Sequence, residues 1–349
     1  MIAPTAKPPR PGRVLIIKPS SLGDVVTAVP VLRGLRRTFP QAHIAWMLST
    51  ACAALMEGDS DLDEVVLFDR KRLGKAWRSP AAAWRLAALL RALHRGRYDW
   101  VIDLQGLFRS GFFARASGAP LRAGFADARE GAWLFYTDRH RPQQPHTVDR
   151  NLALARQVGI DARPEDMTLQ VPAAGREFGE SVCRRLGVPA GGFVVCVPPT
   201  RWVTKRYPVR HWRTVVSSLS RRMPVALVGM AGDRELCEEA GGAASERAVN
   251  LAGETTVPEM VGLIAASAGV VCSDSAAKFI APAVGVDAVV LIGPTRIDQT
   301  GPYLRGRCVV ADVPCQGCLK RRCRHVTCME LIAPQTVIAA AEEMLDGRM

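Results

Sequence analysis

The chain has 349 residues and a formal net charge of +13, and 48% of its residues are hydrophobic and 23% are charged. This length exceeds one typical core and indicates two domains, and the composition excludes a disordered chain. The positive charge indicates an acidic partner: nucleic acid, an anionic membrane surface, or a phosphorylated or carboxylated substrate.

The N-terminal residues 1–12 are rich in proline and basic residues and lack the apolar core of a signal peptide, so we expect a disordered leader. The most apolar helical stretch, Ala81 to Leu93, is interrupted by Arg85 and Arg91 and is too short to span a bilayer. These features predict a cytoplasmic protein. The ten cysteines are then expected to be reduced or metal-bound rather than paired.

The first half of the chain alternates short apolar runs with helical patterns. The apolar run Val14 to Ile17 predicts a strand, which is followed by the polar loop Lys18 to Asp24 and a helix whose only irregularity is Pro30. Further strands are expected at 43–48, 65–68 and 100–104, and helices at 81–94 and 150–158. This alternation is typical of a parallel sheet covered on both faces, which binds ligands at the carboxyl ends of its strands.

Residues 121–146 interrupt the alternation, because arginine and histidine are interleaved there with Trp133, Phe135 and Tyr136. We expect an irregular basic and aromatic segment rather than another strand and helix. A connecting strand is predicted at 167–172, with the domain boundary near Pro172. The predicted parts are then an N-terminal domain at 13–172, a C-terminal domain at 173–333 and a terminal helix at 334–349.

The second half repeats the alternation more regularly. Strands are expected at 193–197, 225–228, 249–251, 270–272 and 288–292, and helices at 176–186, from 208, at 233–240, from 258 and at 274–284. Neither a GxGxxG nor a Walker A sequence occurs, so a dinucleotide-binding or P-loop assignment is not supported. The prediction is an α/β protein of two Rossmann-like, doubly wound domains that face a central cleft.

Asp24 is the first candidate for chemistry. The small residues Ser20, Ser21 and Gly23 let a ligand approach the backbone, and the positive end of the following helix favours a negative carboxylate. Such a carboxylate suits a general base that takes a proton from an alcohol. A simple helix cap is the alternative interpretation.

The loop between 199 and 206 is the second candidate. Thr200, Arg201 and Lys205 supply a hydroxyl and two cations between a predicted strand and a predicted helix, which is the chemistry that a diphosphate needs. A solvated basic loop is the alternative.

Two acidic positions in the same half suit a nucleotide. Asp274, Ser275 and Ala276 follow a predicted buried strand, and their small size lets a phosphate reach unsatisfied helix amides. Helix capping by Asp274 or Ser275 is the alternative. Asp233 follows a glycine-containing turn and suits either ribose hydroxyls or a surface cap.

Four cysteines, Cys315, Cys318, Cys323 and Cys328, lie in a basic loop near the C-terminus. Four thiolates satisfy a tetrahedral structural zinc, but only one pair has CxxC spacing, so free or redox-paired thiols remain the alternative. No HExxH, GxSxG or paired-carboxylate pattern occurs, which argues against a zinc protease, a serine hydrolase and a lysozyme-like glycosidase.

Together these segments resemble the ADP-heptose:lipopolysaccharide heptosyltransferases, glycosyltransferase family nine, over nearly the whole chain and in the same order. The matching segments are 18–24, 101–107, 200–208, Asp274-Ser275 with its helix, and 293–303. The segment from Ala128 to Arg150 is similar to the corresponding region of the heptosyltransferase I branch, which acts on the Kdo residues of lipid A.

The resemblance implies a GT-B fold in which the first domain binds the acceptor and the second binds ADP-heptose, with inversion at the anomeric carbon and no required cofactor or catalytic metal. It implies that Asp24 deprotonates the acceptor hydroxyl and that Lys205 stabilises the leaving ADP. Donor binding is implied for Thr200, Arg201, Lys205, Asp233, Thr255, Asp274, Ser275 and Ala276, and acceptor binding for Ser20, Ser21, Gly23, Gln105, Arg129 and Arg139. The implied acceptor is an acidic glycolipid, reached by peripheral contact with the anionic inner membrane.

The sequence departs from the family pattern at the start of the predicted phosphate helix. Ala276 stands where the family commonly has glycine and Phe279 where it has histidine, with Lys278 adjacent. Another nucleotide sugar is therefore an alternative donor. A basic zinc- and nucleic-acid-binding protein is the alternative from another class, although no nucleic-acid-binding module is recognisable and we expect no nucleic-acid partner.

Overall fold

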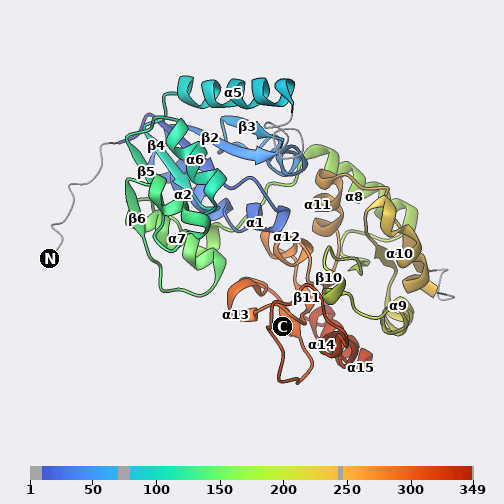
Figure 1. Ribbon diagram of the computed structural model, residues 1–349. Coiled ribbons are helices and arrows are strands. Elements are labelled where there is room, and N and C mark those ends of the chain that lie inside the picture. Colours follow the sequence, from blue (N-terminus) through green and yellow to red (C-terminus); the bar gives the residue numbers. More distant parts are fainter. Residues whose placement is uncertain (1–9, 70–78, 243–246, 348–349) are drawn as a thin grey trace. The chain divides into compact units, whose positions relative to one another are not determined.

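The computed structural model describes residues 10–69, 79–242 and 247–347 (Figure 1). The chain forms two compact units, residues 1–167 and 168–349, each built on its own parallel sheet. The division lies between residues 167 and 168, whereas the predicted domain boundary is near Pro172. Most of the expected leader, residues 1–9, lies outside the described residues.

The first unit contains six parallel strands in the order β3-β2-β1-β4-β5-β6. They are β1 (Arg13–Ile17), β2 (His43–Ser49), β3 (Glu64–Phe68), β4 (Trp100–Asp103), β5 (Leu121–Phe125) and β6 (Asp138–His140). The chain direction across the sheet reverses between β1 and β4, so the loops that follow these two strands diverge at one point. In open α/β sheets, this switch point is where ligands bind.

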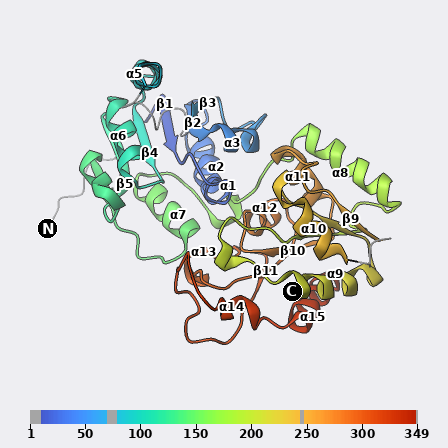
Figure 2. The same cartoon turned by 45° about the vertical axis from the view of Figure 1, so that its right-hand side comes forward.

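Helices cover both faces of this sheet. They are α1 (Leu22–Val26), α2 (Val29–Thr38), α3 (Thr50–Ala53), α5 (Pro80–Arg95), α6 (Phe108–Ala116) and α7 (Thr147–Gln157), with 3-10 turns η1 (Ala54–Met56), η2 (Arg129–Phe135) and η3 (Pro164–Asp166). Leu15 and Ile17 point to one face, where they pack with Leu93 of α5 and Phe113 of α6. Helices α2 and α7 cover the other face (Figures 1 and 2).

The second unit repeats the same topology, with strand order β12-β11-β10-β7-β8-β9 and all pairs parallel. Its strands are β7 (Val194–Val197), β8 (Val225–Leu227), β9 (Ala248–Asn250), β10 (Gly269–Ser273), β11 (Ala288–Leu291) and β12 (Arg307–Val309). The switch point lies between β7 and β10. It is therefore the end of these two strands that should carry the second ligand site.

The helices of the second unit again lie on both faces. They are α8 (Ala173–Leu186), α9 (Val209–Arg222), α10 (Arg234–Gly241), α11 (Val257–Ala265), α12 (Ala277–Ala283), α13 (Ile297–Thr300), α14 (Thr327–Glu330) and α15 (Pro334–Leu345), with 3-10 turns η4 (Val203–Lys205) and η5 (Ala231–Asp233). Trp212 and Val215 of α9 pack with Ala340 of α15 in a core on one face of this sheet. Helices α8, α11 and α12 lie across the sheet from α9 and α15 (Figures 1 and 2). No helix within the described ranges has both the length and the apolar character needed to cross a membrane.

Three expectations for the first unit are wrong. The helix expected after Asp24 is two helices, α1 and α2, because the second starts anew with Pro30 in its first turn. The segment 121–146 contains strands β5 and β6, since Gly124 leaves room for the ring of Tyr136 where any side chain would overlap it. Residues 167–172 are not a strand and pair with no sheet.

Two expectations for the second unit are also wrong. The helix predicted to begin at Asp274 begins at Ala277, because the Asp274 side chain binds two lysines instead of capping the helix. The strand expected to be the last, β11, is followed by β12, which pairs with its outer edge.

Helices α8 and α11 approach so closely that glycine is required at their crossing. A Cβ atom at Gly262 would overlap the backbone of Gly175, and a Cβ at Gly175 would overlap the carbonyl of Pro258. We expect Gly262→Ala to lower the free energy of unfolding by about 1–3 kcal/mol, because overpacking forces the helices apart. Chemical denaturation measures this, with Gly232→Ala as the control, since a Cβ at Gly232 meets no atom within 4 Å. Equal stability of the two variants would contradict the close crossing.

Candidate functional site

Asp24 lies in α1, directly after the β1 loop at the switch point of the first sheet. Its Oδ2 accepts hydrogen bonds from the backbone nitrogen and from the hydroxyl of Ser21, both at 2.8 Å. Among the described residues, its other carboxylate oxygen receives no hydrogen bond. The carboxylate is half-buried, so it is held in place through one oxygen while the other is available to accept a proton.

A buried lysine and a buried aspartate stand beside this carboxylate. Lys18, only 6% exposed, follows β1, and its ammonium donates to the carbonyl of Leu104 at 2.7 Å. Burial lowers the pKa of Lys18 below the ordinary 10.5, and Asp24 and Asp103 offset part of that shift. The Lys18 ammonium therefore faces two carboxylates at the ends of β1 and β4.

Asp103 ends β4 and fixes the turn that follows it. Its Oδ1 accepts from the backbone nitrogens of Gln105 and Gly106 at 2.8 and 3.2 Å, and its Oδ2 accepts from the Tyr136 hydroxyl at 2.6 Å. Burial raises the pKa of Asp103 despite these hydrogen bonds. Gln105 is thereby presented at the switch point.

The remaining acceptor candidates of the first unit lie near this turn. Ser20 and Ser21 are half-buried in the loop after β1, and Gly23 is buried in α1. The backbone nitrogen of Arg129 donates to the carbonyl of Gly106 at 3.0 Å, which places exposed Arg129 next to the β4 turn. Exposed Arg139, on β6, stacks on Trp133 with its guanidinium 5.2 Å from the ring centre.

In the second unit, two lysines share one aspartate at the switch point. Asp274 follows β10, and its carboxylate binds the ammonium of Lys205 at 2.8 Å and that of Lys278 at 2.5 Å. Thr295 donates its hydroxyl to the same carboxylate. The side chains of Asp274 and Lys278 are 2% and 5% exposed, and that of Lys205 is 14% exposed. Lys205 is thus the cation of this cluster that solvent reaches.

The pKa shifts of Asp274 and Lys205 reflect two ammonium groups that share one carboxylate. Burial by itself would raise the pKa of Asp274, but Lys278 and Lys205 outweigh burial and hold that pKa below its usual range. Burial lowers the pKa of Lys205, and Asp274 opposes this while Lys278 and Arg321 add to it. With one carboxylate for two ammoniums, the cluster keeps an excess positive charge that suits a phosphate group.

Four other candidates for donor binding lie in the two loops that carry Lys205 and Asp274. The Thr200 hydroxyl donates to the Asp274 carbonyl at 3.4 Å, while Arg201 is exposed in the same loop. Ser275 and Ala276 form the turn between β10 and α12, and Ala276, rather than Asp274 or Ser275, is the N-cap. These residues therefore gather at the ends of β7 and β10.

Asp233 and Thr255 occupy neighbouring loops of the same unit. The carboxylate of Asp233 accepts from the backbone nitrogen of Met230 at 3.0 Å, which is the local capping role that the sequence left open. Thr255 is half-buried and precedes Thr256, the N-cap of α11. The described contacts of Asp233 and Thr255 therefore do not indicate that either residue binds a ligand.

The four cysteines of the 315–328 loop line one small cavity, together with residues that include Thr204, Pro294 and His325. Across the described ranges, no group of three or more His, Cys, Asp or Glu side chains lies close enough together, as arranged here, to hold a metal ion. All four cysteines are free thiols here. Structural zinc therefore remains a proposal.

Three residues of these sites were missed as site residues by the sequence analysis: Lys18, Asp103 and Lys278. Lys18 directly follows four buried apolar residues of a strand, which is an unusual place for a lysine unless it has a partner. Lys278 is four residues after Asp274, a spacing that brings side chains together on a helix. Asp103 was missed because its distant partner Tyr136 is brought to it by the sheet, and the sequence gives no local sign of that contact.

Comparison with known proteins shows similarity to heptosyltransferases over most of the chain. The pattern of glycosyltransferase family 9 (heptosyltransferase) matches residues 86–328. The chain is similar to lipopolysaccharide heptosyltransferase 1 of Pseudomonas aeruginosa, with 29% identity over 90% of this chain and 88% of that protein. It is also similar to lipopolysaccharide heptosyltransferase 2 of Escherichia coli, with 27% identity over 83% and 85% of the two chains.

Solved structures share the fold. The structure of E. coli ADP-heptose lps heptosyltransferase II superposes with a TM-score of 0.76 at 24% identity, over 96% of this chain and 99% of that one. The structure of E. coli heptosyltransferase WaaC with ADP gives a TM-score of 0.76 at 22% identity, over 95% and 99% of the two chains. The two doubly wound units are those of the GT-B fold. The chain is a glycosyltransferase and belongs to glycosyltransferase family 9, the heptosyltransferases.

Proposed function

We propose that the protein transfers heptose from ADP-heptose to the Kdo inner core of lipid A, with inversion at the anomeric carbon. The observation that carries this proposal is the buried Lys205–Asp274–Lys278 cluster at the switch point of the second sheet, in a chain of this family. Its excess positive charge and its partly accessible Lys205 suit the diphosphate of a nucleotide sugar. Relatives named as lipopolysaccharide heptosyltransferases support the sugar and the acceptor.

In this mechanism, the first unit binds the acceptor and Asp24 is the general base. The oxygen of Asp24 that receives no described hydrogen bond takes the proton of the attacking acceptor hydroxyl, while the other oxygen stays fixed by Ser21. Burial lowers the pKa of the neighbouring Lys18 ammonium, and the charges of Asp24 and Asp103 oppose that shift. Ser20, Ser21, Gly23, Gln105, Arg129 and Arg139 are proposed to contact the acidic acceptor.

The second unit binds the donor and supports departure of ADP. Lys205 binds the diphosphate and neutralises the charge that develops on the leaving phosphate as the glycosidic bond breaks. Thr200, Arg201, Ser275 and Ala276 complete the diphosphate site, and Asp233 and Thr255 are proposed at the ribose and the adenine. Electrostatic stabilisation of this kind needs no metal ion.

The structure bears on the alternative of a different donor sugar. Phe279, which stands where the family commonly has histidine, is buried, and the ammonium of Lys278 lies 4.9 Å from its ring centre. Lys278 therefore supplies a cation next to the position where the imidazole is missing. This favours a donor with a diphosphate, which ADP-heptose shares with other nucleotide sugars, and the relatives named as heptosyltransferases support ADP-heptose among them.

The direct test mixes the purified protein with ADP-heptose and Kdo-lipid A. We expect ADP release together with a mass gain of one heptose on the lipid. Consumption of another nucleotide sugar without heptose transfer would replace the donor in this proposal. Binding to nucleic acid with a steep salt dependence and no turnover would replace the proposal altogether. We propose a cytoplasmic protein with peripheral contact to the inner membrane, and sedimentation with anionic vesicles tests that membrane contact.

The lowered pKa of Lys205 predicts a change at alkaline pH. Because kcat/KM reports ionisations of the free enzyme, kcat/KM for the donor should fall at a pH below the ordinary lysine value of 10.5 as Lys205 loses its proton. In Lys205→Arg the guanidinium stays charged, so this alkaline decline should move to higher pH even if the maximum rate is lower. Identical alkaline limbs in the two proteins would show that another group titrates.

A further inference from the structure

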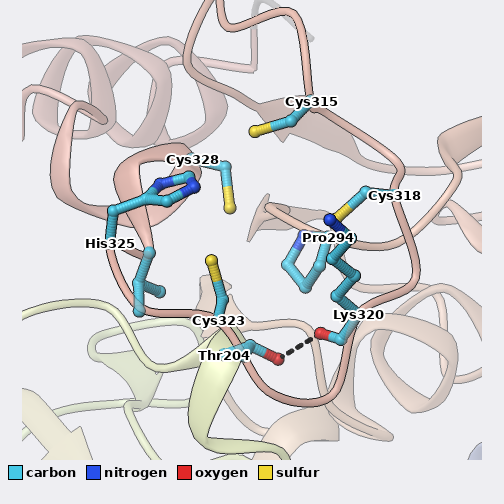
Figure 3. A pocket seen from close by; sticks show the side chains of 9 residues that line it. Thr204, Pro294, Cys315, Cys318, Lys320, Cys323, His325 and Cys328 are labelled. Carbon is cyan, nitrogen blue, oxygen red and sulfur yellow. Dashed lines mark hydrogen bonds between the residues drawn. The ribbon is translucent and has the colours of Figure 1, made fainter.

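The four cysteines of the C-terminal loop are placed as a set around one enclosed space. Cys315, Cys318 and Cys323 come from the loop between β12 and α14, and Cys328 comes from α14 itself. They line a cavity of about 40 Å³, and Figure 3 shows their sulfur atoms turned toward that common space. The space admits a single ion or a few water molecules and no organic ligand.

The chemistry of the lining matches a soft metal ion. Four thiolates form the tetrahedral ligand set that Zn²⁺ takes in structural sites, and S₄ sites also take iron. The Nδ1 atom of His325 is already engaged by the Thr327 hydroxyl and lies 3.3 Å from the Thr327 backbone nitrogen, which donates to it. The thiols are thus a complete set without the imidazole.

The charge of the loop favours the metal-bound form. A divalent ion with four thiolates carries a net charge of −2, and the loop carries Lys320, Arg321, Arg322 and Arg324 within a few residues of the cysteines. Nearby cations stabilise thiolates. The basic character of this loop is therefore accounted for without a nucleic-acid partner.

Hydrogen bonds and an aromatic contact connect the cysteine loop, residues 315–328, to the segments that carry Lys205 and Thr295. The hydroxyl of Thr204 donates to the carbonyl of Lys320 at 3.0 Å, and Gln316 donates to the carbonyl of Thr295 at 3.2 Å. Thr295 in turn binds Asp274.

A further contact between the cysteine loop and the Lys205 segment passes through an aromatic ring. The guanidinium of Arg321 lies 4.6 Å from the ring centre of Trp202, and the ammonium of Lys205 lies 4.4 Å from the same ring centre. A bound ion that fixes the cysteine loop would therefore also fix Thr204, Trp202 and Thr295, which lie beside or contact Lys205 and Asp274.

We propose that Cys315, Cys318, Cys323 and Cys328 bind one thiophilic metal ion, Zn²⁺ or Fe²⁺, and that this ion positions the loop supporting Lys205. On binding, four thiols release their protons to solvent and four metal–sulfur bonds of about 2.3 Å form, which draws the sulfurs inward. The ion takes no part in the transfer reaction. The inference adds a structural site to the proposed function and does not depend on the identity of the sugar.

The first arm of the test measures metal directly. Protein purified under reducing conditions should contain one equivalent of zinc or iron per chain, and elemental analysis distinguishes the two metals. Cys315→Ser and Cys328→Ser should lose it, while Cys183→Ser, which changes a buried cysteine of α8 outside the loop, should keep it. Reconstitution of stripped wild-type protein with Co²⁺ should give the intense absorption of a tetrahedral thiolate site.

The second arm uses the wild-type chain, so that a variant that fails to fold does not decide the result. Removal of the metal with a chelator should expose four additional thiols to a thiol reagent and weaken ADP binding about tenfold or more, with recovery on reloading. The proposed metal site would be contradicted if the purified protein contained no metal and chelation did not change the number of reactive thiols. A disulfide within the loop would contradict it as well. Bound metal whose removal leaves ADP affinity unchanged would overturn its positioning role.

Discussion

Asp24→Asn should reduce kcat about 10²–10⁴-fold, the usual contribution of a general base, while leaving the KM for the donor nearly unchanged. The substituted amide oxygen still accepts the two hydrogen bonds from Ser21, so the start of α1 is preserved and the proton acceptor is lost. Steady-state kinetics with ADP release as the readout measures the effect.

Asp99→Asn is the matched control for this substitution. Like Asp24, Asp99 accepts two hydrogen bonds through one carboxylate oxygen, from Gly12 at 2.7 Å and Arg13 at 2.8 Å, but it lies at the amino end of β1, away from the switch point. Its kcat should match that of the wild type. If Asp24→Asn retained activity within a few-fold of the control, Asp24 would be a helix-stabilising residue and not the base.

Asp274→Asn should lower the free energy of unfolding by about 3–5 kcal/mol, because it leaves two buried or partly buried ammoniums without their shared counter-ion. Donor binding should weaken as well, since Lys205 loses its orientation. Denaturant unfolding measures the first effect and ADP titration the second. Asp298→Asn removes an exposed ion pair with Arg296 and should leave both quantities unchanged.

The stability difference between the wild type and Asp274→Asn should also depend on pH. The pKa of Asp274 is lowered in the folded protein, so its carboxylate stabilises the fold fully above the ordinary value of 3.8 and loses that contribution as pH falls through the lower folded value. The difference in Tm between wild type and Asp274→Asn should therefore be constant near neutral pH and should shrink in acid. A difference that stays constant in acid would mean that Asp274 is not ionised in the fold.

Local sequence patterns predicted most of the strands and helices of this chain. The apolar runs before Lys18 and Pro198 and the alternation of strand and helix were sufficient to predict two doubly wound units. The strand order was not predictable in this way, because it depends on contacts between strands far apart in the sequence. The common switch points of both sheets therefore emerged only from the structure.

The errors have specific physical causes. Strand β5 was missed because Arg122 and Gly124 weaken its apolar pattern, although the Arg122 side chain reaches the carbonyl of Phe135 and Gly124 accommodates Tyr136. The start of α12 was placed too early because an aspartate followed by small residues is typical of an N-cap, whereas Asp274 serves tertiary contacts.

Candidate residues were easier to predict than their partners. Asp24, Lys205 and Asp274 were each identified from loop position and charge, and the structure places them at the two switch points. The ion pair between Lys205 and Asp274 joins positions 69 residues apart in sequence, and the hydrogen bond between Thr295 and Asp274 joins loops that only the sheet brings together. Whether Asp24 acts as a base stays a prediction.

The shared carboxylate of Asp274 also determines how anions are exchanged at this site. Lys205 already has a counter-ion, so a diphosphate that binds there competes with an internal carboxylate instead of meeting a bare cation. Under the proposed function, Lys205 would re-form its internal ion pair with Asp274 when the nucleotide diphosphate leaves, which would lower the free-energy cost of releasing a highly charged product.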